Sequence, residues 1–284
     1  MTDTVAPLSG VGGCREVGPG EAPAVLRALA ADPFVAAPAA EKFLLSGITG
    51  GVDGRFLTRG GPDRSLVYVG SSVLPIRGDA ADSDLLGRAI VDLGVGPMSV
   101  HGRREQVADL WPALADGWGP IREYRSAQFL MALQRRVDPA LVLDGIRPAT
   151  LHEFEPVLTA AADMYREELR ADPFAVGAGV PFRRRVARSV ARGRTWVGLD
   201  RGEVFFKADV AAISERVAQI QGIWVDPLRR GTGLGGGGTA AVCAALQARG
   251  LTPSLVVNSS NVPARAAYRR VGLVDVVDYA TILM

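Results

Sequence analysis

The feature that most constrains the fold of this chain is a glycine-rich segment, VDPLRRGTGLGGGG, at residues 225–238. An apolar run that suits a strand ends at Val225, and Pro227 cannot donate a hydrogen bond to a neighbouring strand. The glycines then let the backbone turn with its N–H groups facing one point, just before a helical pattern begins. Because the start of a helix offers unpaired N–H groups and partial positive charge, this junction predicts a cradle for phosphate.

The spacing argues against two common nucleotide-binding loops. A P-loop needs GxxxxGK[ST], and the chain has lysines only at Lys42 and Lys207. A Rossmann fingerprint matches Gly231, Gly233 and Gly236 formally, but it stands far from a first strand and lacks the acidic residue that this fingerprint has about 20 residues later. The glycines alone therefore leave two alternatives open, a phosphate cradle or a glycine-rich turn without a ligand.

A second segment, NSSNVPARAAYRRVGL at residues 258–273, narrows the choice. Taken together, the two segments resemble the GCN5-related N-acetyltransferase (GNAT) superfamily. The family pattern [QR]xxGx[GA] matches residues 230–235, and AxxxYxxxGF matches Ala264, Tyr268 and Gly272, with Leu273 in place of Phe. The resemblance covers residues 144–284.

The resemblance implies an α/β (α+β) fold with a mixed, mostly antiparallel sheet flanked by helices. It also implies acetyl-CoA as co-substrate and no metal. Asn261 is expected to bond the pantetheine arm, or to cap the helix that begins at Val262. The strand ending at Trp224 and Val225 is expected to pair with the same arm. The pyrophosphate is expected on the backbone amides of Arg230, Gly231, Thr232, Gly233, Leu234 and Gly235.

The resemblance also assigns a proton donor. Tyr268 is expected near the sulfur, where a phenol with a pKa near 10 can protonate a departing thiolate of similar basicity. The alternative is a tyrosine that only packs its helix on the sheet.

The proton acceptor is less clear from the sequence. Gln219 and Gln221 stand where many family members have a glutamate, and glutamine cannot accept a proton. Asp209, on the neighbouring predicted strand, is the candidate base, although it alternates with Lys207 and can pair with it. Residues 166–170, REELR, indicate a solvated helix face, so Glu167 and Glu168 are weaker candidates.

The predicted function is acetyl transfer from acetyl-CoA to a primary amine by direct attack. The acceptor is left open among a protein lysine, a protein N-terminus and a small molecule. The alternative is a catalytically weak module that senses acyl-CoA or binds a partner. The missing strand glutamate favours this module, and Tyr268 favours the enzyme.

Length and linker composition predict two domains, because 284 residues are long for one. Prolines and a glycine near residues 137–148 place the boundary between 1–143 and 144–284. The first half has no glycine-rich strand–helix junction, and we expect a degenerate copy of the same fold without a cofactor motif. It also resembles the uncharacterised domain that precedes the acetyltransferase domain in some actinobacterial proteins.

Apolar periodicity predicts the elements of both halves. In the first half, residues 1–20 are expected to be an irregular lead-in, with helices at 21–31, 83–93 (capped by Ser83) and 104–115, and strands at 42–48, 54–58, 65–74, 98–100 and 129–135. In the second half, helices are predicted at 153–169, 181–192, 234–249 and 262–271, and strands at 195–200, 203–212, 217–225, 254–258 and 274–284.

Composition limits the partners. A net charge of +2 gives no argument for nucleic acid, and no apolar run reaches the length of a membrane span. The basic helix at 183–194 is expected to be a solvated face rather than a contact for the 3′-phosphate of the cofactor or an acidic partner. His101, on a predicted turn, and His152 form no triad. Two isolated cysteines and the lack of a signal-peptide pattern predict a cytoplasmic protein.

Overall fold

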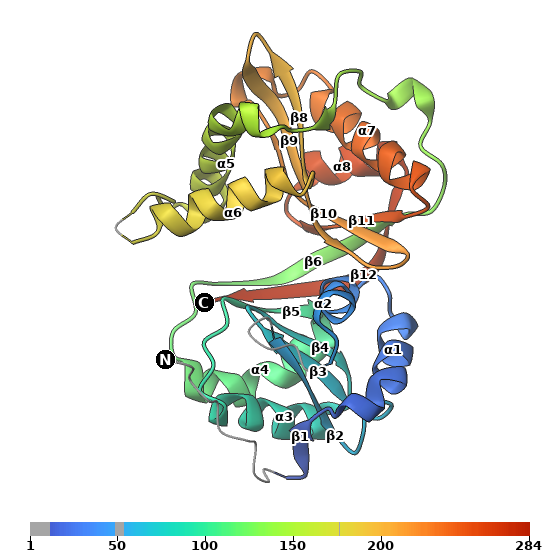
Figure 1. Ribbon diagram of the computed structural model, residues 1–284, viewed down its shortest axis with the longest axis vertical. Coiled ribbons are helices and arrows are strands. Elements are labelled where there is room, and N and C mark those ends of the chain that lie inside the picture. Colours follow the sequence, from blue (N-terminus) through green and yellow to red (C-terminus); the bar gives the residue numbers. More distant parts are fainter. Residues whose placement is uncertain (1–11, 49–53, 176) are drawn as a thin grey trace. The chain divides into compact units, whose positions relative to one another are not determined.

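The computed structural model describes residues 12–48, 54–175 and 177–284 (Figure 1). The chain forms two compact units: unit 1 comprises residues 1–130 and 275–284, and unit 2 comprises residues 131–274. The predicted boundary at residue 144 therefore falls inside unit 2, and the last ten residues belong to unit 1. The described helices include none that is long and apolar enough to cross a membrane.

Unit 2 follows the predicted order of elements. It contains β7 (Arg147–Pro148), α5 (Phe154–Leu169), α6 (Gly179–Ala191), β8 (Thr195–Asp200), β9 (Glu203–Ile213), β10 (Val217–Val225), α7 (Leu234–Ala248), β11 (Thr252–Asn258) and α8 (Val262–Val271), with short 3-10 turns at Pro139–Leu141, Leu151–Glu153 and Pro227–Arg229. The predicted bounds of these helices and strands hold within two residues, except that the two-residue strand β7 was missed.

The sheet of unit 2 runs in the order β11-β10-β9-β8-β7. Its pairs are antiparallel except for β10 and β11, which run parallel. The β8–β9 hairpin turns through Arg201 and Gly202, both at positive φ (52° and 84°), as a two-residue hairpin loop requires.

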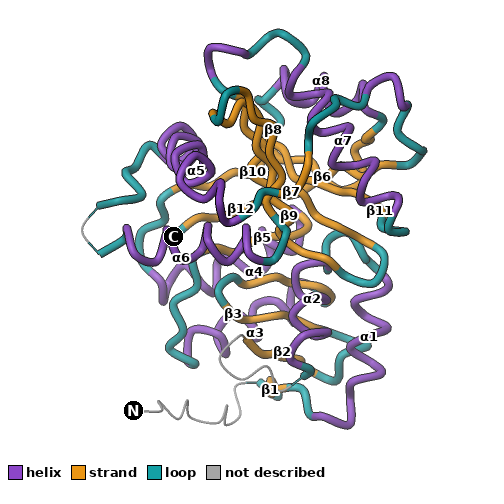
Figure 2. Tube along the Cα trace, turned by 45° about the horizontal axis from the view of Figure 1, so that its top comes forward, coloured by secondary structure: helices purple, strands orange, loops and turns teal. Residues whose placement is uncertain are grey.

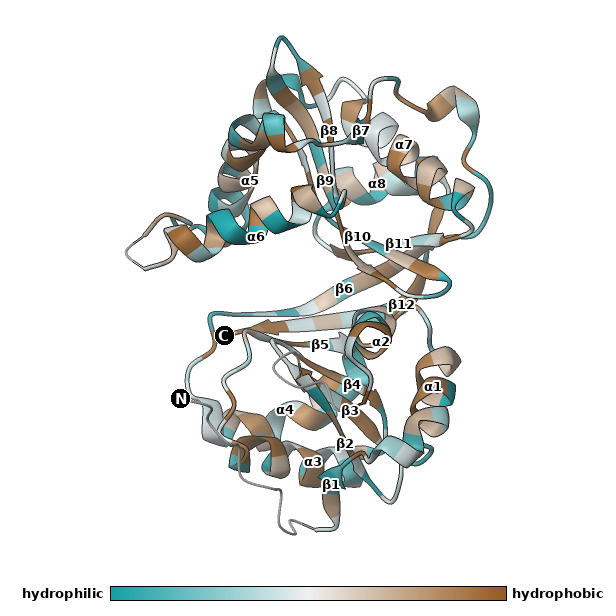
Figure 3. Ribbon diagram, in the orientation of Figure 1, coloured by the Kyte–Doolittle hydropathy of each residue, from teal (hydrophilic) through white to brown (hydrophobic). Residues whose placement is uncertain are grey.

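Helices cover both faces of this sheet. On one face, α5 and α6 bury Val157 and Val186 in a cluster with Val197 and Trp224. On the other face, α7 packs on Phe206 of β9. The hydrophobic residues accordingly concentrate on the strands and the inner sides of the helices (Figure 3).

Unit 1 contains β1 (Cys14–Glu16), α1 (Ala22–Ala31), α2 (Ala37–Ser46), β2 (Gly54–Arg59), β3 (Leu66–Gly70), β4 (Val73–Arg77), α3 (Ala80–Asp92), β5 (Ser99–Arg103), α4 (Arg104–Trp118), most of β6 (Glu123–Leu133) and most of β12 (Leu273–Leu283). A 3-10 turn at Pro19–Glu21 precedes α1. The strands of unit 1 lie in the order β1-β2-β3-β4-β5-β12-β6. Strands β4 and β5 are parallel, and the pairs β1–β2, β2–β3, β3–β4 and β5–β12 are antiparallel.

The order of elements along the chain repeats one pattern twice. From β1 to β6 the order is strand, two helices, three strands, helix, strand, helix, strand, and from β7 to β12 it is the same (Figure 2). In each repeat the third and fourth β-strands are antiparallel, and the fourth and fifth are parallel. The fold is thus a mixed, mostly antiparallel sheet flanked by helices in a tandem arrangement, as predicted.

Several predictions for unit 1 were wrong. Residues 42–48 belong mainly to α2, because a short apolar run does not by itself distinguish a strand from a helix. The predicted strand 65–74 is a hairpin of β3 and β4, in which Gly70 N–H donates to Ser72 O (2.9 Å). Helix α3 begins earlier than expected, because Asp79 rather than Ser83 caps it. Strand β1 lies inside the segment expected to be irregular.

Candidate functional site

The glycine-rich segment forms the loop that leads from β10 into α7. Gly231 and Gly233 have positive φ (80° and 89°), a conformation that favours glycine. The backbone bonding of α7 begins where Gly237 N–H donates to Gly233 O (3.0 Å). The amides of the first helical turn, at residues 234–236, therefore have no acceptor within the helix, and they form the donor end that the sequence predicted.

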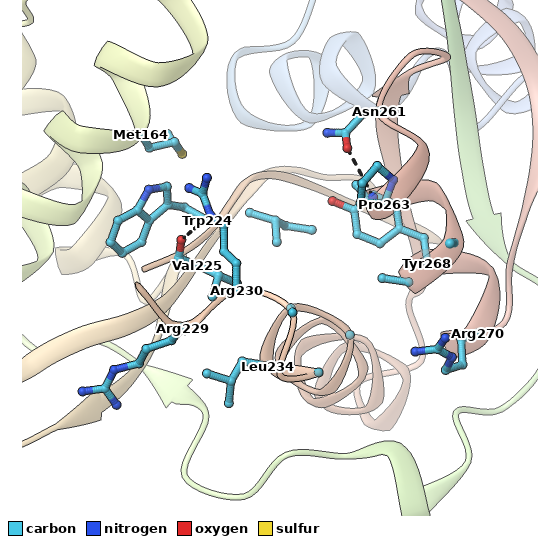
Figure 4. A pocket seen from close by; sticks show the side chains of 18 of the residues that line it. Met164, Trp224, Val225, Arg229, Arg230, Leu234, Asn261, Pro263, Tyr268 and Arg270 are labelled. Atoms are coloured by element: carbon cyan, nitrogen blue, oxygen red, sulfur yellow. Dashed lines mark hydrogen bonds between the residues drawn. The ribbon is translucent and has the colours of Figure 1, made fainter. Parts of the chain in front are cut away.

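These amides open on a cavity of about 580 Å³ (Figure 4). Of the predicted cofactor contacts, all but one line it: Trp224, Val225, Arg230, Gly231, Gly233, Leu234, Gly235 and Asn261. Thr232 is the exception, and its hydroxyl donates to Arg229 O within the loop (2.7 Å). Tyr268 lines the same cavity, so the structure brings the predicted proton donor to the cradle.

The strands diverge beside this cavity. The parallel pairing of β10 with β11 joins Val217–Ile220 to Thr252–Leu255, and in the described chain it stops there. Beyond that point β10 has an irregular register against β9, and Gly222 takes a positive φ of 56°. The last residues of β10 thus border the cavity and are not paired with β11.

Asn261 caps the start of α8, and Tyr268 lies within that helix. The Asn261 side chain accepts a hydrogen bond from Ala264 N–H (3.2 Å), so the predicted cap is present, and the residue lines the cavity as well. Tyr268 is only 9% exposed. Burial, together with the nearby negative charge of Glu168, raises the pKa of the Tyr268 phenol. The phenol is therefore protonated at neutral pH, as a proton donor must be.

Asp209, the candidate base, is already bonded to two neighbouring side chains. Its carboxylate accepts a hydrogen bond from the Thr195 hydroxyl (2.7 Å) and forms an ion pair with the buried Lys207. Asp209 is not among the residues that line the cavity, although it borders Gly222 next to it. The pairing with Lys207 that the sequence allowed is therefore present.

Helix α5 contributes more to the cavity than the sequence indicated. Glu167 and Glu168 line it, and both are exposed, as expected for a solvated helix face. Glu167 forms an ion pair with Arg230 (2.6 Å), and Arg230 Nε also donates to Val225 O (3.1 Å). Arg230 thus ties α5 to the loop of the cradle.

Other lining residues were not among the predicted site residues. They are Met164, Ile223, Arg229, Gly236, Pro263, Ala264, Ala266, Ala267 and Arg270. Helical spacing would have found Ala267, three residues after Ala264, and then Arg270, three residues after Ala267, because residues three or four apart share a face. Nothing in the sequence pointed to Met164, which reaches the cavity from α5.

Neither histidine is among the residues that line the cavity. His101 is in β5 rather than on a turn, and its ring contacts the Tyr279 hydroxyl (2.6 Å) and Ser72 Oγ (3.1 Å). Arg183 of α6 forms an ion pair with Glu155 (2.6 Å), and no residue of α6 lines the cavity.

Comparison with known families agrees with this geometry. Residues 160–273 match the model of the acetyltransferase (GNAT) family. The C-terminal half of the chain is a GNAT domain. Residues 54–157, before it, match a domain of unknown function, DUF4081. No curated protein shows significant sequence similarity to the chain.

Solved structures share the fold over nearly the whole chain. A GNAT-family acetyltransferase from Colwellia psychrerythraea is 11% identical, with a TM-score of 0.55 over 95% of this chain and 99% of that one. A GCN5-related N-acetyltransferase from Sphaerobacter thermophilus is 17% identical, with a TM-score of 0.57 over 95% and 94%. A Drosophila protein is 14% identical, with a TM-score of 0.61 over 96% and 98%.

Proposed function

We propose that the GNAT domain transfers an acetyl group from acetyl-CoA to a primary amine. The observation that carries this proposal is that the free amides at the start of α7 and the phenol of Tyr268 line one cavity. The amides suit the pyrophosphate, because a helix start offers N–H donors and partial positive charge. The buried phenol suits the sulfur end of the same molecule.

The cofactor would lie along the diverging strand. Backbone groups of Trp224 and Val225 would pair with the pantetheine arm as an added strand does. The amine nitrogen attacks the thioester carbon and a tetrahedral intermediate forms. The C–S bond then breaks, and Tyr268 gives its proton to the departing thiolate.

Two carboxylates, Asp209 and Glu168, are candidates for the base that accepts the proton of the amine. Asp209 keeps the predicted role only if the amine reaches it past Gly222, and its oxygens are already bonded to Thr195 and Lys207. Glu168 lines the cavity directly. Glu168→Gln should therefore lower the rate more than Asp209→Asn below the pKa of the amine, provided that both proteins fold.

The acceptor belongs to one of three classes: a protein lysine, a protein N-terminus or a small amine. The test is calorimetry with acetyl-CoA, followed by release of free thiol over a panel of such amines. Binding with turnover on one class supports the enzyme. Binding without thiol release on any class supports a module that senses acyl-CoA, and no binding contradicts both.

For unit 1 we propose a degenerate copy of the fold that holds no cofactor. Helix α3 follows the fourth strand of the first repeat, as α7 does in the second repeat. The start of α3 is capped by a side chain of the chain itself, because the Asp79 carboxylate accepts a hydrogen bond from Asp82 N–H (2.8 Å). The buried Asp82 carboxylate is itself held by Arg59 (2.7 Å) and Arg64 (3.2 Å). Carboxylates at this position repel phosphate, whereas α7 has glycines there.

A cytoplasmic location remains part of the proposal. Both Cys14 and Cys243 are free and buried. Unpaired cysteines fit a reducing compartment.

A further inference from the structure

Arg270 differs from the other two arginines of the cavity. Arg229 is held by Asp200 (2.9 Å), and Arg230 is held by Glu167 (2.6 Å). Within the described ranges, the side chain of Arg270 makes no hydrogen bond or ion pair, and it is exposed on α8. Its charge is therefore the one among these three arginines that no carboxylate neutralises.

Arg270 lies on the side of the cavity that is formed by the start of α7, where the proposed function puts the pyrophosphate. Ala267, one turn earlier on α8, has its Cβ 3.9 Å from the position that a Cβ on Gly236 would take. Residues three apart share a helix face, so Arg270 extends the face that borders the first turn of α7. Figure 4 shows Arg270 next to that turn, across the cavity from Trp224 and on the other side of Leu234 from Arg229.

Coenzyme A has one phosphate group besides the pyrophosphate that the cradle is proposed to bind. Its pyrophosphate matches the amides at the start of α7, but a third phosphate hangs from the 3′ carbon of the ribose. That group is a separate anion one sugar away from the pyrophosphate. An unpaired guanidinium matches it, since arginine binds phosphate through two parallel hydrogen bonds and no ion pair has to break first.

We propose that Arg270 binds the 3′-phosphate and makes the GNAT domain select coenzyme A over 3′-dephospho-coenzyme A. The inference rests on the proposed function, because it assumes the pyrophosphate on α7. It gives a role to a side chain that the family patterns in this sequence leave unassigned, and it replaces the basic helix α6 as the candidate for this contact.

The experiment is calorimetry on the full chain with two ligands, coenzyme A and 3′-dephospho-coenzyme A. We expect the wild type to bind coenzyme A about tenfold more tightly, a difference of about 1.4 kcal/mol. Arg270→Ala should lose that tenfold for coenzyme A and bind the dephospho form unchanged. Arg270→Lys should keep part of the preference, because it keeps the charge but not the paired geometry. Arg269→Ala, one residue earlier and outside the cavity lining, should keep all of it.

The outcomes separate this inference from the proposed function. Equal wild-type affinities for the two ligands would overturn the role of Arg270 while leaving the acetyltransferase intact. An equal loss for both ligands in Arg270→Ala would also overturn it, and would place Arg270 at the pyrophosphate or in the packing of α8. If neither ligand binds the wild type, the proposed function falls and this inference falls with it.

Discussion

Gly238 of α7 and Phe206 of β9 approach so closely that a Cβ on Gly238 would lie 2.4 Å from a ring carbon of Phe206. Phe206 is fully buried. This contact explains why a glycine persists in the helix past the cradle. Gly237 is constrained as well, because a Cβ there would lie 3.0 Å from Leu143 Cβ. The glycine run is thus used for packing at its end and for the cradle at its start.

Gly238→Ala should therefore destabilise the protein. Overpacking of this kind costs about 1–3 kcal/mol, which exceeds or offsets the roughly 1 kcal/mol that alanine adds to helix stability. The measurement is urea unfolding. Gly236→Ala is the matched control, because its Cβ would meet only Ala267 at 3.9 Å, and it should be neutral or stabilising. Equal effects of the two changes would show that the Phe206 contact does not matter.

Gly233→Val should abolish acetyl-CoA binding. Gly233 has a φ of 89°, which a β-branched residue cannot adopt without strain, and it starts the turn whose amides face the cavity. Gly250→Val is the control, since Gly250 also has a positive φ (77°) but follows the other end of α7. We expect calorimetry to show lost affinity for the first variant and wild-type affinity for the second. Unchanged affinity of a folded Gly233→Val protein would contradict the proposed phosphate cradle.

Tyr268→Phe should lower kcat by about 10²–10⁴-fold, the usual contribution of a general acid, with little change in cofactor affinity. The raised pKa of Tyr268 also predicts no loss of rate from its ionisation up to about pH 10. Tyr165→Phe is the control, because Tyr165 packs against Phe182 with ring centroids 5.5 Å apart. Rates that match the wild type from pH 6 to 9 would assign Tyr268 to packing alone.

His101 should make stability depend on pH. Burial lowers the pKa of His101 from 6.5 to about 4, so the folded protein holds the neutral ring beside Tyr279 and Ser72. Between pH 6.5 and 4 the unfolded chain binds the extra proton, so stability is present above pH 6.5 and is lost as the pH falls toward 4. The slope from one proton is at most about 1.4 kcal/mol per pH unit.

The comparison for His101 is the free energy of unfolding of the wild type and of His101→Asn across this range. The variant lacks the titrating ring, so the advantage of the wild type should shrink as the pH falls. A gap that stays constant from pH 7 to 4.5 would contradict the buried neutral ring.

The sequence predicted unit 2 well because its signals are local. The loop from Arg230 to Gly235, the cap at Asn261 and the turn at Arg201 each depend on a few neighbouring residues. Contacts between residues far apart in the sequence could not be predicted in this way. No local pattern shows that Glu167 forms an ion pair with Arg230, or that His101 is hydrogen-bonded to Tyr279. In unit 1 the helix α2 was mistaken for a strand, since short apolar runs fit both.

The linker between the predicted domains supports the cradle. Leu143 N–H donates to Gly237 O (3.2 Å), and Val137 N–H donates to the Gln247 side chain (3.1 Å), so residues 137–143 follow α7 along its length. A fragment of residues 131–274 should therefore melt at a higher temperature and bind coenzyme A more tightly than a fragment of residues 144–274. The shorter fragment exposes the packed glycines of α7 and leaves these backbone groups to water. Thermal unfolding and calorimetry on the pair, with the full chain as reference, make the test. Identical behaviour of the two fragments would show that the segment before residue 144 contributes nothing to the start of α7.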